Sequence, residues 1–306
     1  LVIGAAAGLL WWVGRGRLAA PTVLLAFLVV LPLLLEASIE YYTLILSEPW
    51  FILGWVGVLV LWMSAAERPP GRSRLLLFAA AGALVAATIL VRSQAIVLLP
   101  AVAIALLVRR YSLPERLVVA VIVLVPLGAW HLYHSALIER GPVSRLPDEG
   151  PYIEWVQGAG ATLRALLAGV GSNVLLYLTQ FGDYLSGISA LGKVEAAVIL
   201  GGGVAGAGFA ARRHPVLALP ALGGLAMVLI WPFAQDRLLL PLLPFLGLAT
   251  CAALSPTYQR ASLPTRRGIS LLLAVLIAMA LFRQPEVRKE GVAATVENRN
   301  PAFFTP

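Results

Sequence analysis

The sequence predicts an all-α protein, a polytopic transmembrane bundle of about ten helices. Three observations lead to this prediction. Hydrophobic residues make up 60% of the 306-residue chain and charged residues only 12%, whereas soluble domains carry about 25% charged residues. The apolar residues fall in runs separated by Arg, Pro and polar clusters, and the basic residues occupy alternate loops. A chain with so few charges cannot face water all round, so we expect it to lie in a membrane.

The apolar runs give the expected helices. They lie at about 1–13, 19–35, 49–65, 75–91, 94–108, 117–134, 194–211, 215–232, 238–254 and 269–282. Several are shorter than the roughly 20 residues that a span needs, and flanking Trp, Tyr and Arg can extend them at the interface. The two runs on either side of Arg92 could instead form one helical hairpin. We expect one transmembrane domain at 1–282 and a polar extracytoplasmic tail at 283–306.

The segment at about 135–193 is expected to be an outer loop that carries a helix. Its first part, GPVSRLPDEGPYIEW, contains Pro and Gly residues that break helices. The later stretch, ATLRALLAGVGSNVLLYLTQFGDYL, is apolar but interrupted by Arg164, Asn173, Gln180 and Asp183. This pattern favours a helix in the membrane interface, or a re-entrant piece, over a full span.

The basic loops predict the orientation, because cytoplasmic loops of membrane proteins are enriched in Lys and Arg. The loops expected inside carry Arg15 and Arg17; Arg68, Arg72 and Arg74; Arg109, Arg110 and Arg116; Arg212 and Arg213; and Arg260, Arg266 and Arg267. The positions expected outside are Glu36, Glu40, Glu48, Arg92, the segment after His134, Asp236, Arg237 and the C-terminal tail.

Other features of the composition limit the function classes. The formal charge of +8 is concentrated in those loops and reports topology, so we expect membrane lipids and no nucleic acid as partners. The single cysteine, Cys251, can form no disulfide within the chain. The chain begins on Leu1 inside an apolar run, without the basic region of a signal peptide, so we expect further protein before it.

A glutamate directly before a proline, Glu48-Pro49, forms the first candidate site. One interpretation is local, since Pro49 suits the first turn of a helix and Glu48 complements the positive helix end. The other is functional: a carboxylate at the outer rim, in a low dielectric, can be a base, a metal ligand or a substrate anchor. Glu36 and Glu40 could share its face or be solvated rim charges.

Two arginines on the same predicted side extend this candidate site. Arg92 ends one run and Gln94 begins the next. Arg92 could bind phosphate through its planar fork, or extend to the interface as terminal arginines do. Asp236 and Arg237 precede a run with two prolines near its start, where freed backbone groups need neighbours or cavity water. Arg237 is therefore a functional candidate, the alternative being an ion pair with Asp236 at the rim.

These stretches resemble motifs of the GT-C superfamily, membrane glycosyltransferases that take sugars from polyprenyl-phosphate donors. The likeness is closest to bacterial family 39-like and mannosyltransferase-like members. Ser47-Glu48-Pro49 stands where that group has an acidic residue in an outer loop. Arg92-Ser93-Gln94-Ala95 corresponds to a later Arg-Pro turn, with serine in place of proline. The stretch RLLLPLLP at 237–244 matches a late motif, with leucine where tyrosine is common.

The resemblance implies an inverting transfer of a sugar, such as mannose or arabinose, to a lipid, glycan or protein acceptor outside a bacterial plasma membrane. It implies a catalytic role for Glu48 and binding of the lipid phosphate by Arg237 and Arg92, with Glu40, Gln94 and Asp236 as further substrate-site residues. The family's main catalytic acidic residue lies in the first outer loop, which we expect before Leu1. Glu48 would then be a second acidic residue that positions the acceptor or a divalent cation.

Two other functions remain open. A transporter or flippase of a lipid-linked substrate would favour inverted repeats and charges near the bilayer midplane, and neither is visible in the sequence. A non-catalytic membrane scaffold would have lost its catalytic residues.

Two patterns concern packing rather than chemistry. The stretch GGGVAGAG, Gly201 to Gly208, predicts a close approach between helices. The eight tryptophans fall mostly near predicted helix ends, which is typical of interface belts.

Overall fold

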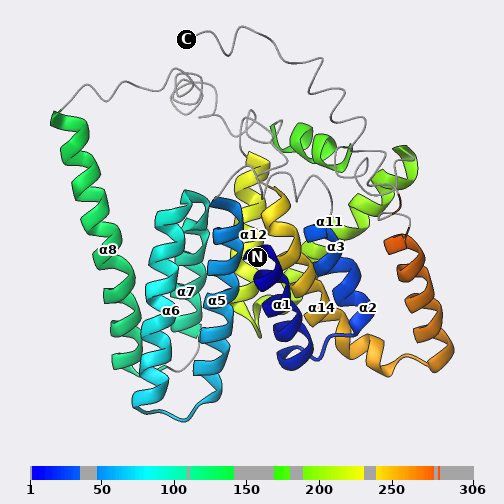
Figure 1. The fold of residues 1–306 in the computed structure, drawn as a ribbon, viewed down its shortest axis with the longest axis horizontal. Coiled ribbons are helices and arrows are strands. Elements are labelled where there is room, and N and C mark those ends of the chain that lie inside the picture. The colour runs from blue at the N-terminus through cyan, green and yellow to red at the C-terminus, as the bar shows by residue number, and fades with distance from the viewer. Residues whose placement is uncertain are drawn as a thin grey trace, which may run out of the picture.

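The structure, a computed structural model, describes residues 2–34, 47–108, 111–140, 169–179, 189–230, 239–278 and 282. Regular secondary structure within these ranges is helical, which confirms the predicted all-α class. Figure 1 shows most of the helices standing side by side, and the successive helices between residues 47 and 140 run in alternating directions.

The described residues form α-helices of 4 to 28 residues. They are α1 (Val2–Trp12), α2 (Thr22–Leu25), α3 (Leu31–Leu34), α5 (Ser47–Glu67), α6 (Arg72–Val91), α7 (Leu98–Val108), α8 (Leu113–Arg140), α11 (Ser189–Ala211), α12 (Pro215–Ile230) and α14 (Leu243–Arg260). Residues 169–179 and 263–278 are also helical. π-Helical turns at Val13–Arg17 and Ala26–Val30, and 3₁₀ turns at Ser93–Val97 and Leu240–Leu242, extend neighbouring α-helices.

Each of the predicted helical ranges contains helix in the structure. By length and composition, four helical segments can cross a membrane: Glu48–Glu67, Arg72–Val91, Leu113–Tyr133 and Leu240–Arg260. Shorter apolar helices occupy Thr22–Leu33, Gln94–Val108, Ala196–Ala211 and Pro215–Ile230. The described part of the chain is therefore a helical bundle of the membrane type, while ten complete spans remain a prediction.

The sixth helix is longer than predicted. It was expected at 117–134, but α8 has 28 residues, from Leu113 to Arg140. It begins early because the carboxylate of Glu115 accepts a hydrogen bond from the backbone N–H of Ser112 at 2.7 Å, one half of a capping box. α8 packs on α6 near Gly82 and stands at the margin of the bundle (Figure 1). Its outward side chains are apolar, as lipid contact requires: Leu117, Val121 and Leu124 are 53%, 56% and 60% exposed.

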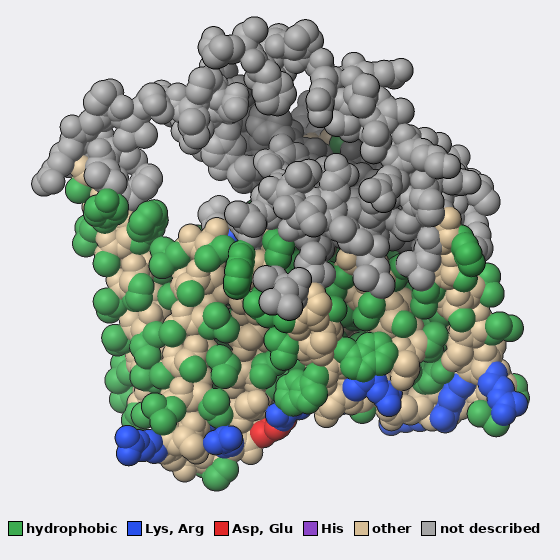
Figure 2. Space-filling view, in the orientation of Figure 1, with side chains coloured by type: hydrophobic (Ala, Val, Ile, Leu, Met, Phe, Trp, Pro, Cys, Tyr) green, Lys and Arg blue, Asp and Glu red, His purple; other side chains and the backbone are tan. Residues whose placement is uncertain are grey.

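The described arginine-bearing loops lie at one end of the bundle, here called the basic end. Figure 2 shows Lys and Arg side chains along this lower edge, below a broad apolar band. The arginine-bearing loops that alternate with other loops along the sequence therefore lie together at one end of the structure. Two ion pairs and two cavities join the loops: Arg17 with Glu67, Arg74 with Glu115, a cavity lined by both Glu67 and Arg213, and another lined by both Arg15 and Arg266.

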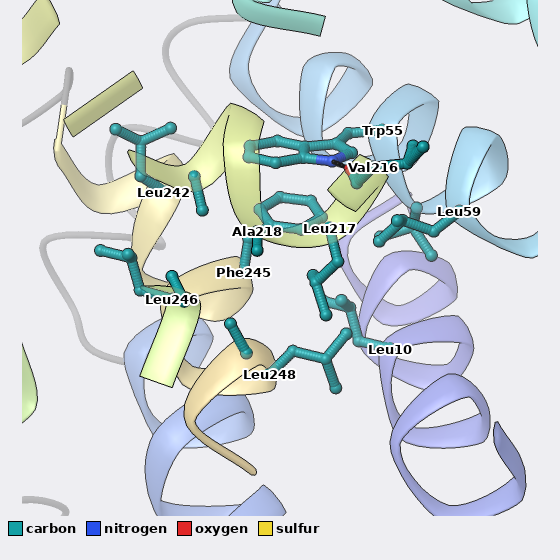
Figure 3. Packing of buried hydrophobic residues seen from close by; sticks show 14 of the residues in the cluster. Leu10, Trp55, Leu59, Val216, Leu217, Ala218, Leu242, Phe245, Leu246 and Leu248 are labelled. Atoms are coloured by element: carbon teal, nitrogen blue, oxygen red, sulfur yellow. Dashed lines mark hydrogen bonds between the residues drawn. The ribbon is translucent and has the colours of Figure 1, made fainter. Parts of the chain in front are cut away.

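The core is organised around Trp55 of α5 (Figure 3). Its indole stacks on Phe245 of α14, with ring centroids 3.6 Å apart and planes 12° apart. Its Nε1 donates a hydrogen bond to the carbonyl of Val216 on α12, at 3.4 Å. Helices α5, α12 and α14 therefore meet at one buried side chain.

Some of the described tryptophans lie at exposed helix ends, where interface belts are expected, and others are buried within the bundle. Trp12 and Trp50, at helix ends, are 45% and 51% exposed. Trp55 and Trp62 are 0% and 5% exposed, because both lie within α5 on sides that face neighbouring helices. Trp62 packs edge-on against Phe78 of α6, with centroids 5.1 Å apart.

The glycine-rich stretch of α11 brings this helix close to α14, as predicted. A Cβ added to Gly206 would lie 2.5 Å from the Cα of Thr250, and one added to Gly203 would meet Leu246 at 3.0 Å. The hydroxyl of Thr250 donates to the carbonyl of Gly202 at 3.0 Å. Gly201, by contrast, has nothing within 4 Å of its Cβ position.

The predicted outer segment at 135–193 is only partly described. α8 extends to Arg140 and α11 begins at Ser189, so both helices enter the range that was expected to be loop. Residues 169–179, within the stretch predicted as an interfacial helix, form a helix that lies across the end of the bundle (green in Figure 1). The side-chain amide of Asn173 donates to the carbonyl of Leu229 near the end of α12, at 2.8 Å. The tail at 283–306 lies outside the described residues.

The close contact of α11 with α14 is testable with one matched pair of substitutions. Replacing glycine by alanine inside a helix ordinarily stabilises it by roughly 0.5–1 kcal/mol. At position 206 the added methyl must displace the α14 backbone, an overpacking that costs about 1–3 kcal/mol. We therefore expect Gly206→Ala to lower the thermal unfolding midpoint of the purified protein in detergent. Gly201→Ala should leave that midpoint unchanged or raise it. Equal midpoints for the two variants would contradict the close approach.

Candidate functional site

The candidate site lies where α5 begins and α6 ends, opposite the basic end. Glu48 is in the first turn of α5, where its charge complements the positive end of the helix. Arg92 follows α6 in an extended conformation, with φ −148° and ψ 118°. Its backbone N–H closes the last turn of α6 onto the carbonyl of Thr88 at 3.0 Å, and its carbonyl accepts from the N–H of Ala95 at 2.9 Å. Arg92 is thus the corner between α6 and the next helical segment.

The corner brings three predicted site residues together. The guanidinium of Arg92 forms an ion pair with the carboxylate of Glu48. Its Nε donates a hydrogen bond to the side-chain oxygen of Gln94 at 2.5 Å. The side chains of Glu48 and Arg92 are 1% and 10% exposed. The site is therefore a buried charge pair extended by an amide.

The distance between α5 and α6 near this pair is set by small side chains. Gly54, less than two turns after Glu48, lies against the side chain of Thr88, one turn before Arg92. The hydroxyl of Thr88 donates to the carbonyl of Leu84 at 2.6 Å, so no polar group is left without a partner at this contact. Close helix packing therefore holds the carboxylate and the guanidinium in register.

The pair changes the interpretation of Arg92. Extension to the membrane interface was one alternative from the sequence, but the side chain is buried and meets Glu48 instead. The local interpretation of Glu48 as a helix-start residue holds, and it does not exclude a second role. The sequence reasoning missed the pairing itself. The signal was present, because α5 and α6 have 21 and 20 residues, and an antiparallel hairpin of equal arms places Glu48 beside Arg92.

The remaining predicted site residues lie outside the part of the chain that the structure describes. They are Arg237, Asp236 and Glu40, and their roles stay predictions. Among the described residues, no group of three or more His, Cys, Asp or Glu side chains could hold a metal ion.

Chemically, the site combines a carboxylate that can accept a proton with a guanidinium suited to phosphate. A guanidinium carries five N–H donors, so it can hold a carboxylate, an amide and a phosphate oxygen together. A buried pair also has a purely structural use, since it fixes how two helices are aligned. Comparisons with protein-family models, curated proteins and solved structures found no match.

The burial of the pair predicts a large effect of removing one charge. Glu48→Gln leaves the buried guanidinium without its carboxylate and should lower the free energy of unfolding by about 3 kcal/mol. The control is Glu67→Gln, the same change in the Arg17–Glu67 pair at the basic end, where the glutamate side chain is 56% exposed. That variant should lose at most about 1 kcal/mol. Chemical denaturation in detergent measures both.

A double variant separates charge from packing. Glu48→Gln combined with Arg92→Gln removes both charges and should recover most of the lost stability. A Glu48→Gln variant as stable as Glu67→Gln would show that the Glu48–Arg92 pair is not buried.

Proposed function

We propose that the protein is a membrane glycosyltransferase that moves a sugar from a polyprenyl-phosphate donor to a lipid, glycan or protein acceptor. In this proposal the chain spans a bacterial plasma membrane about ten times, with the basic end in the cytoplasm and the site at Glu48 outside. The observation that carries the proposal is the buried Glu48–Arg92 pair at the end away from the arginine-bearing loops. The resemblance of the surrounding stretches to GT-C motifs gives this pair its chemical interpretation.

The two charges match the two substrates of such a reaction. Arg92 would bind the donor phosphate, and Glu48 would accept a hydrogen bond from the acceptor hydroxyl. The hydroxyl oxygen attacks the anomeric carbon of the sugar while the bond from that carbon to the phosphate oxygen breaks. The hydroxyl proton passes to a carboxylate, either that of Glu48 or of a further acidic residue, and the lipid phosphate leaves with the bonding electrons. The guanidinium stabilises the negative charge that develops on the leaving phosphate.

The ion pair between Glu48 and Arg92 fits this role. An arriving phosphate would share the guanidinium of Arg92 and weaken its attraction for Glu48. The carboxylate of Glu48 could then accept a hydrogen bond from the acceptor hydroxyl. We propose Arg237 as a second group for the phosphate. Gln94 orients Arg92, and Glu40 and Asp236 are further substrate-site residues.

Replacing Arg92 by lysine tests directly whether its guanidinium binds the donor phosphate. Arg92→Lys keeps the positive charge but loses the planar fork. We expect at least about a tenfold fall in sugar transfer, because one bidentate phosphate contact is lost. The matched control is Arg74→Lys, since Arg74 is similarly buried and pairs with Glu115 at the basic end. Transfer of labelled sugar from polyprenyl-phosphate donors by the purified protein measures both. Undiminished transfer by a folded Arg92→Lys variant would contradict the proposal.

Arg237 gives an independent prediction. Arg237→Ala should abolish transfer while the protein remains folded in detergent, because the phosphate loses a permanent positive charge. Full turnover by this variant would remove Arg237 from the mechanism. If reconstituted protein moved the lipid-linked sugar across the bilayer without transferring it, the transporter alternative would replace the glycosyltransferase.

A further inference from the structure

A second polar site lies at the basic end, at the opposite end of the bundle from the Glu48–Arg92 pair. It is an open depression of about 390 Å³ between the loop after α1 and the turn after α14. Its polar side chains come from both segments: Arg15 and Thr22 from the first, and Tyr258, Gln259, Arg266 and Ser270 from the second. The first and last described parts of the chain therefore form one surface.

Among the described residues, the charge of this depression is uncompensated. Arg15 and Arg266 line it, and no acidic side chain from the described ranges does. Neither arginine forms an ion pair within the described residues, whereas Arg17 and Arg74 at the same end pair with glutamates. Two positive charges at one concave surface favour an anionic ligand.

The lining is ordered by hydrogen bonds to the backbone. Arg15 Nη1 donates to the carbonyl of Ala20 at 3.0 Å, and Arg266 Nε donates to the carbonyl of Ala261 at 2.7 Å. The side chain of Gln259 donates to the carbonyl of Ala19 at 3.1 Å, which ties the two segments together. Ala19 has a φ of 48°, a conformation that non-glycine residues seldom adopt. The guanidinium groups are thus held at the rim of a defined depression.

The surroundings favour a ligand that is part lipid. The helix at 263–278 begins at this depression, and next to Ser270 it carries exposed apolar side chains. Ile269, Leu271 and Leu272 are 36%, 68% and 60% exposed. A phosphate in the depression would therefore have an apolar surface beside it along which acyl chains can lie.

We propose that this depression binds the phosphate of an anionic phospholipid headgroup. The guanidinium forks of Arg15 and Arg266 would hold the phosphate oxygens. The hydrogen-bonded hydroxyls of Tyr258 and Ser270, 2.8 Å apart, would face the rest of the headgroup. A bound lipid would connect the loop after α1 to the helix at 263–278 and so stabilise the folded bundle.

The test uses the full chain, purified and delipidated in detergent. Phosphatidylglycerol, phosphatidylcholine and inorganic phosphate are added separately, and the thermal unfolding midpoint is followed as each is titrated. Phosphatidylglycerol should raise the midpoint, phosphatidylcholine should raise it less, and inorganic phosphate should have little effect. The double variant Arg15→Gln/Arg266→Gln should need at least about tenfold more phosphatidylglycerol for the same rise.

Matched controls separate a specific site from general attraction to the basic end. Arg72→Gln/Arg267→Gln removes the same charge from two exposed arginines that do not line the depression, and should respond as the wild type does. Equal weakening by the two double variants would overturn the proposal in favour of general attraction. An effect of inorganic phosphate equal to that of phosphatidylglycerol would overturn the lipid assignment.

Because Arg266 also donates hydrogen bonds to backbone carbonyls, its replacement could disturb the fold, so Arg15→Gln alone provides a second variant. The Arg15→Gln variant should need about threefold more phosphatidylglycerol for the same rise, and an unchanged titration would contradict the site.

Discussion

A charged side chain in an apolar bundle must meet an opposite charge or reach water, because an isolated charge in a low dielectric is strongly unfavourable. The described residues satisfy this constraint at both ends. Arg74 and Glu115, 12% and 6% exposed, pair at the basic end with Nε and Oε1 2.8 Å apart. Glu48 and Arg92 pair at the opposite end. Arg17 and Glu67 pair with more exposure to water. Each pair joins segments that are separate in the chain, so these ion pairs also show which segments are neighbours in the structure.

Uncharged contacts make those pairs possible. Trp55 joins α5 to α12 and α14, and Gly206 lets α11 approach α14 closely. Gly54 sets the distance between α5 and α6 beside the Glu48–Arg92 pair. The geometry of the proposed site is therefore fixed largely by residues with no chemistry of their own. This is the usual requirement for a reactive group whose position must be maintained without substrate.

The helices could be predicted because each apolar run is bounded by charged or helix-breaking residues, and the grouping of the arginines followed from their alternation along the chain. Details that depend on neighbouring helices could not be predicted. The burial of Trp55 could not be predicted, because α5 is apolar on all sides and its sequence does not show which face packs inward. The pairing of Arg74 with Glu115 depends on α8 lying beside α6, which is a matter of tertiary arrangement. At the candidate site, Glu48, Arg92 and Gln94 were predicted as members, but their ion pair was not. The pair follows once α5 and α6 are known to be antiparallel and nearly equal in length, with 21 and 20 residues.

The length of α8 has a consequence for the bilayer around the protein. At 28 residues and 1.5 Å per residue, the helix measures about 42 Å, whereas a hydrocarbon core is about 30 Å thick. Its candidate membrane span, Leu113–Tyr133, has 21 residues and measures about 32 Å, so this part matches the core and residues 134–140 would project beyond the acyl chains. Because α8 packs mainly on α6 within the described residues, its tilt can change with membrane thickness more easily than that of a helix enclosed by several neighbours.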